Sequence, residues 1–90
     1  MKKQFRDAYN WAIKVQRACM FKQVTVEVKS QFCRANYERG NIDAWSLYLW
    51  VWREEDNKWA EAQWVAWDPD RFESEKQEII SYLNSKGIKL

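Results

Sequence analysis

The chain has 90 residues, 47% of them hydrophobic and 31% charged, which is the balance of a folded domain rather than of a disordered segment. This length favours one compact domain over residues 1–90 and excludes a separate catalytic domain or a repeat array. The net charge is +2, but residues 1–39 hold nine Lys or Arg against three acids, so one half of the chain is basic and the other acidic.

Histidine is absent from the sequence, and only Cys19 and Cys33 supply thiols. Catalysis by Ser-His-Asp or Cys-His groups is therefore excluded, and the common four-ligand zinc sites lack ligands. We expect no enzyme activity, no catalytic residues, no metal and no cofactor. We expect that the charged N-terminal residues are not a signal peptide, because no apolar stretch follows them, and no apolar run reaches the roughly 20 residues of a membrane span. We therefore predict a cytoplasmic protein with no membrane partner, in which both thiols stay reduced and act as small hydrophobic groups.

The first predicted element is an amphipathic helix over residues 3–20. Its charged residues fall in one arc of roughly 100°, and the wide remainder is mostly apolar, so more than half of the helix should be buried. The outer face is basic, and since a basic amphipathic helix can be a membrane or nucleic-acid element, this face is a secondary candidate site. The residues of this basic face are Lys3, Arg6, Lys14 and Arg17.

Three strands are predicted next, over residues 23–33, 44–53 and 58–67. The first alternates valines with polar residues, and the second is apolar on both faces, which indicates the central strand. The connections are short enough for an antiparallel meander. The last element is a helix with Asp68 as N-cap, Pro69 at its first position and Gly87 just beyond its end, where Ile88 folds back on Leu83.

The predicted fold is therefore α+β, with the order α-β-β-β-α and both helices on one face of the sheet. Strand alternation assigns the alanines and Trp64 of the third strand, together with Trp45, Leu47, Leu49 and Val51, to the face that the helices cover. The opposite face should carry a patch of aromatic rings in a polar surround. Two alternatives stay open: the rings cover one another, or residues 34–43 fold over them. The predicted partner-binding residues are Lys29, Tyr48, Trp50, Trp52, Trp59, Gln63 and Trp67.

An aromatic patch of this kind is typical of a partner site on a soluble protein. We expect a non-enzymatic interaction module that binds a protein partner or a second copy of itself, such as an inhibitor of phage or mobile-element type that occludes a larger protein. The alternative is a nucleic-acid-binding protein, in which the rings stack on bases and the basic first helix contacts phosphates. The element order resembles that of the double-stranded-RNA-binding domain, but Asp68-Pro69-Asp70 stands where that domain has a basic run.

Overall fold

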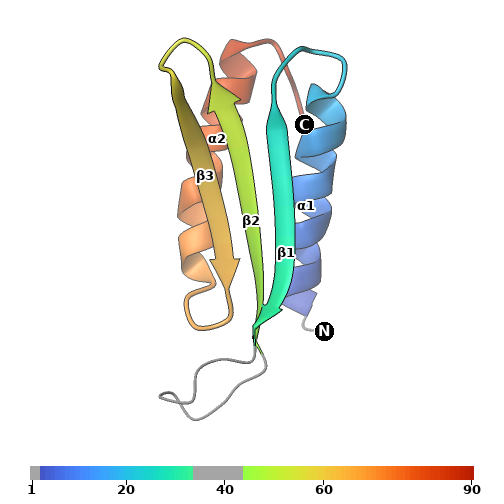
Figure 1. Ribbon diagram of the computed structural model, residues 1–90, viewed down its shortest axis with the longest axis vertical. Helices are drawn as coiled ribbons and strands as arrows, with labels where there is room; N and C mark the ends of the chain where they lie inside the picture. The colour runs from blue at the N-terminus through green and yellow to red at the C-terminus, as the bar shows by residue number, and fades with distance from the viewer. Residues whose placement is uncertain (1–2, 34–43) are drawn as a thin grey trace.

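Three antiparallel strands form a sheet, and two helices lie against it, in the computed structural model of the chain (Figure 1). The structure describes residues 3–33 and 44–90, and for residues 31–33 and 44 it describes the main chain alone. The elements are α1 (Lys3–Cys19), β1 (Val26–Cys33), β2 (Ala44–Arg53), β3 (Lys58–Val65) and α2 (Asp70–Ser85). The predicted α+β class and the order α-β-β-β-α are confirmed, while the predicted loop over residues 34–43 lies outside the described residues.

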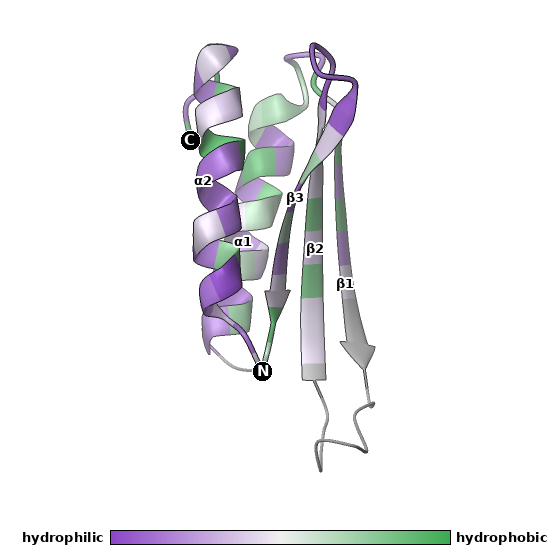
Figure 2. Ribbon diagram, turned by 90° about the vertical axis from the view of Figure 1, so that its left-hand side faces the viewer, coloured by the Kyte–Doolittle hydropathy of each residue, from purple (hydrophilic) through white to green (hydrophobic). Residues whose placement is uncertain are grey.

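Both helices lie in one layer and all three strands in the other, as Figure 2 shows with the sheet turned nearly edge-on. The strand order is β1-β2-β3, so β2 is the central strand, as predicted. Val28 lies opposite Leu49, and Leu49 lies opposite Ala62. Because residues that pair across strands point to the same face, the apolar set of each strand faces the helices. Residues with at most 1% exposure are Ala12, Val15, Cys19, Leu47, Leu49, Val51, Ala60, Ala62, Phe72, Ile79 and Leu83.

Three predicted boundaries are wrong by one to three residues, because turns replace the ends of the elements. The helix α1 ends at Cys19 rather than at residue 20. The strand β1 starts at Val26 rather than at residue 23, since Gln23 has a φ of 60° and cannot continue an extended chain. The strand β3 ends at Val65, where the main-chain N–H of Asp68 donates to the Val65 carbonyl at 3.2 Å. Trp67 consequently lies in the connection to α2 and not on a strand.

The start of α2 differs from the prediction that Asp68 caps it. Pro69 directly precedes the helix with helical angles, φ −68° and ψ −23°, and no side chain forms a capping hydrogen bond at this end. The main-chain carbonyl of Asp68 accepts a hydrogen bond from the Arg71 N–H at 3.4 Å instead. Proline suits this place because its fixed φ is already helical and its missing N–H has no partner to lose.

The end of α2 is confirmed as predicted. Gly87 has a φ of +75°, and the N–H of Ile88 donates to the Leu83 carbonyl at 2.9 Å. The N–H of Gly87 donates to the Asn84 carbonyl at 3.0 Å, which completes the Schellman pattern. Ile88 is 3% exposed, so the reversal of the chain returns an apolar side chain to the core.

Polar contacts join the tip of the β2–β3 hairpin to α2. The Tyr82 hydroxyl donates to Glu55 at 2.8 Å, and Lys86 forms an ion pair with the same carboxylate. Arg53 pairs with Glu78 at 3.1 Å and lies over the Tyr82 ring at 5.0 Å. These contacts hold α2 along β3, and neither helix lies on the opposite face of the sheet.

Candidate functional site

The helix-free face of the sheet carries the predicted aromatic residues in three rows that run across the strands. One row places Lys29 opposite Tyr48 and Tyr48 opposite Gln63, and the next places Trp50 between Glu27 and Glu61. In the third row Trp52 lies opposite Trp59. Six of the seven predicted partner-binding residues therefore share this face, and Trp67 alone lies beyond it in the β3–α2 connection. We call the rings of Tyr48, Trp50, Trp52 and Trp59 the aromatic face.

The four rings form two close pairs. Tyr48 and Trp50 are stacked, with centroids 5.4 Å apart and planes inclined by 7°. Trp52 and Trp59 meet edge to face at 5.1 Å and 66°. The indole N–H of Trp50 donates to Glu61 at 2.9 Å, so its polar atom is satisfied without help from a partner. These contacts restrict the rotation of the rings, so little side-chain entropy remains to be lost on this surface.

The aromatic face is partly open to solvent. Trp59 is 42% exposed, and the other three rings are half-buried, because each covers part of its neighbour. One alternative from the sequence was that the rings cover one another, and the structure confirms this in part. At the end of the sheet beyond Tyr48, Ser46 and Val65 face the same side but are 4% and 2% exposed. The open part of the face therefore lies over the Tyr48-to-Trp59 region.

The polar surround of the aromatic face carries little charge. The charged residues of the surround are Lys29, Glu27 and Glu61, and all three are exposed. One positive and two negative charges give this surface a formal charge of −1. Gln63 is half-buried, and its main-chain N–H donates to the Glu75 carboxylate of α2 at 2.9 Å. The surface is thus apolar at its centre, polar at its rim and almost neutral, which is the composition of a protein interface.

The basic face predicted on the first helix lies on the other layer of the molecule (Figure 2). Lys3, Arg6, Lys14 and Arg17 are all exposed on α1, and Lys3 forms an ion pair with Asp7 at 3.0 Å. Since α1 covers the opposite side of the sheet, these cations and the aromatic face point away from each other. The two predicted surfaces are therefore separate and do not combine into one site.

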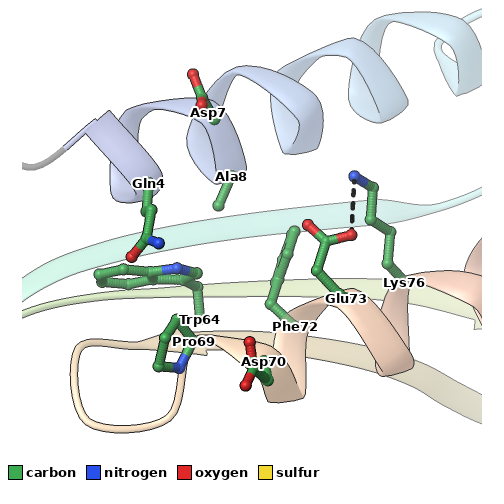
Figure 3. Close-up of a pocket in the computed structure, with 9 residues that line it drawn as sticks. All are labelled: Gln4, Asp7, Ala8, Trp64, Pro69, Asp70, Phe72, Glu73 and Lys76. Carbon is green, nitrogen blue, oxygen red and sulfur yellow. Dashed lines mark ion pairs between the residues drawn. The ribbon is translucent and has the colours of Figure 1, made fainter.

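A hollow of about 160 Å³ between the N-terminal halves of the two helices has no counterpart in the sequence prediction (Figure 3). Its floor is the indole of Trp64, over which Gln4 extends from α1, and Phe72 stands beside it. On α2, Lys76 pairs with Glu73 at 3.7 Å and lies 4.8 Å from the centroid of the Trp11 ring. The Lys76 ammonium group thus already has contacts within the protein, and the hollow is a partly polar gap between the two helices.

Within residues 3–33 and 44–90, no group of three or more carboxylate or thiol side chains is placed to hold a metal ion. In that same part of the chain, neither helix has the length and apolar character to cross a bilayer. Cys19 is a free thiol with 1% exposure, and burial raises its pKa. The prediction of an unpaired, buried thiol concerns Cys33 as well, whose side chain is outside the described part of the structure.

Comparison of the chain with known protein families, with curated proteins and with solved structures found no match. A function for this protein has to be inferred from the geometry and chemistry of its surfaces.

Proposed function

We propose that the chain is a protein-binding module and that the aromatic face is its contact surface. The observation that carries this proposal is the pairing of Trp52 with an exposed Trp59 on a side of the sheet to which neither helix belongs. Apolar surface left open on a small domain favours association, since its burial releases about 25 cal/mol per Å². Trp and Tyr are also the side chains that most often dominate the energy of protein interfaces.

The ring contacts support a protein partner over a nucleic acid. Tyr48 and Trp50 stack on each other, so one face of each ring is already covered. Less aromatic surface is then left for unpaired bases to stack on. The surround of the rings has a formal charge of −1, whereas a nucleic-acid site needs cations beside its stacking residues. The cations of α1, from Lys3 to Arg17, lie on the other layer of the molecule. They are therefore too far from the rings to contact the phosphates of a nucleic acid bound there.

In this proposal the protein acts by occupying part of the surface of a larger protein, as an occluding inhibitor of phage or mobile-element type does. The rigid, prearranged rings suit such a role because binding then requires little rearrangement of the module. A cytoplasmic setting fits the buried, unpaired thiol of Cys19.

The test compares two double variants that should leave the core intact. Trp50→Ala with Trp52→Ala removes the centre of the aromatic face, and Lys14→Ala with Arg17→Ala removes two cations from α1. Proteins captured from a lysate by the parent chain should be retained by the α1 variant and lost by the Trp variant, with affinity for the purified partner falling at least about 100-fold. A labelled single-stranded oligonucleotide serves as the probe for the rival function.

Three results would count against the proposal. The Trp variant could retain every protein that the parent binds, which would place the site elsewhere. It could unfold in a circular dichroism melt, which would make the rings part of the core. Tight, salt-sensitive binding of the oligonucleotide that is lost in the Lys14→Ala, Arg17→Ala variant would favour nucleic-acid binding instead.

A further inference from the structure

The two outer edges of the sheet differ in the partners of their main-chain N–H and C=O groups. On β3 the outward N–H of Gln63 donates to Glu75 of α2, so a side chain of the same molecule occupies one of the pairing positions on that edge. On β1 no strand of the described chain lies along the outer edge, because the order β1-β2-β3 ends there. An edge strand with free N–H and C=O groups is a template for pairing with another strand.

The main-chain groups on this open edge can be identified from one hydrogen bond. The N–H of Trp52 donates to the Thr25 carbonyl at 2.9 Å, which makes these two residues a hydrogen-bonded pair between β1 and β2. Antiparallel strands alternate, so every second residue from Thr25 bonds to β2 and the residues between them turn their main-chain groups outward. Val26, Val28 and Ser30 are therefore the residues whose N–H and C=O groups face the open edge.

We propose that a second copy of this chain pairs along this edge, with the two β1 strands antiparallel and Val28 opposite Val28 at the two-fold axis. Val26 then lies opposite Ser30 of the second copy, and all these positions turn their main-chain groups toward each other. The two three-stranded sheets join into one sheet of six strands. Such a two-fold contact uses the same patch on both copies, as closed dimers do.

Charge selects this register over its neighbours. With Val28 on the axis, Glu27 of each copy lies opposite Lys29 of the other, on the helix-free side, where both side chains are exposed. A shift by two residues keeps the hydrogen-bond alternation but places Glu27 opposite Glu27, or Lys29 opposite Lys29. Opposite charges across paired strands are stabilising and like charges are destabilising, so the strand is complementary to itself in one register only.

The helix above the edge has an uncovered apolar stripe on the corresponding side. Trp11 packs edge to face on Phe72 at 5.8 Å, which fixes the side of α1 that faces α2. At 100° per residue, the residues on the side away from α2 form a stripe one turn apart. Tyr9 is 37% exposed, Ile13 and Gln16 are half-buried, and Met20, in the turn directly after α1, is 63% exposed. The stripe consists of Tyr9, Ile13 and Gln16 on α1 and of Met20 just beyond its end.

The proposed dimer covers both incomplete surfaces at once. Val26 and Val28, which are half-buried in one copy, gain the main chain and valines of the second copy. The two α1 helices come to lie antiparallel, with their stripes facing each other and Arg6 and Arg17 on the solvent side, where water screens their charges. Both aromatic faces then point to the same side of the six-stranded sheet. This inference does not rest on the proposed function, because it uses the outer edge of β1 and not the rings of the aromatic face.

Charge reversal tests the register directly. Glu27→Lys and Lys29→Glu each create like-charged pairs at both contacts of the dimer, and sedimentation equilibrium should report dissociation constants raised at least about tenfold. An equimolar mixture of the two variants restores opposite charges at both contacts, so heterodimers should form with the affinity of the parent. Glu73→Lys on α2 and Lys58→Glu on β3, exposed positions on the side of the molecule opposite to β1, are the charge-matched controls and should dimerise like the parent.

Three outcomes would overturn the inference: a parent chain that stays monomeric at about 100 µM, well above the micromolar range of weak specific pairs, single variants that dimerise like the parent, or a mixture that fails to recover. Should either variant fail to fold, hydrogen exchange of the parent decides the matter. The N–H groups of Val28 and Ser30 should exchange slowly in concentrated solution and fast on dilution. Fast exchange at both concentrations would rule out the paired edge.

Discussion

Two tryptophans on the same strand allow a matched test of which face of the sheet is the core. Trp64 is 4% exposed and lies edge to face with Phe5 at 5.5 Å, whereas Trp59 is 42% exposed on the aromatic face. Replacing a buried Trp by Ala costs about 3–5 kcal/mol. At Trp59 the loss is the ring contact with Trp52 and partial burial, about 1 kcal/mol. The free energies of unfolding of the two variants should therefore differ by about 2–4 kcal/mol.

This difference is large against the stability of a domain of this size, which is about 5–13 kcal/mol at 0.05–0.15 kcal/mol per residue. Urea unfolding followed by far-UV circular dichroism should place the midpoint of Trp64→Ala about 1–3 M below that of Trp59→Ala, for an m value of about 1.5 kcal/mol/M. If Trp64→Ala does not fold, Trp64→Phe serves as the milder variant. Equal midpoints, or a greater loss for Trp59→Ala, would mean that the two faces have been assigned the wrong way round.

Two further predictions concern the end of α2 and the buried thiol. An added Cβ at Gly87 meets no described heavy atom within 4 Å, so Gly87→Ala should cost only the strain of a φ of +75°, about 1 kcal/mol. This cost should lower the melting temperature by about 4–8 °C. An unchanged melting temperature would contradict the left-handed turn at Gly87. Burial raises the pKa of Cys19, so the folded state favours its thiol over its thiolate. The resulting contribution to the free energy of unfolding is complete below the ordinary pKa of 9.0 and is lost as the pH rises through the raised pKa. Iodoacetamide at pH 8 should consequently label Cys19 at least about ten times more slowly in the folded chain than in urea, and equal rates would refute its burial.

The regular alternation of the strands is what made the fold predictable from sequence. Val26 and Val28 alternate with charged residues, and β2 is apolar on both faces, so the two faces of the sheet and the central strand follow from a period of two. The Schellman end of α2 was equally predictable, because Gly87 and Ile88 carry its local signals. These features depend on residues close together in the chain.

Burial at the ends of the elements depends on distant neighbours and was not predictable in the same way. Trp45 points toward α1 as predicted but is 36% exposed, and Ser46 on the opposite face is 4% exposed. The hydrogen bond from the Gln63 N–H to Glu75 joins residues 12 positions apart through a side chain, and no periodicity signals it. The open edge of β1 could be recognised only once the strand order and the hydrogen-bonding alternation were known.

The most direct test of the aromatic face as a contact surface is hydroxyl-radical footprinting of the protein with its captured partner. Trp59 is 42% exposed on the aromatic face, and Trp11 is half-buried on α1, on the side that faces α2 and away from the proposed dimer contact, so the two indoles serve as a pair of reporters. Binding of the partner should reduce the oxidation of Trp59 several-fold and leave that of Trp11 at its level in the free protein. Protection of Trp11 with unchanged oxidation of Trp59 would contradict the proposed function and move the binding site to the helical layer.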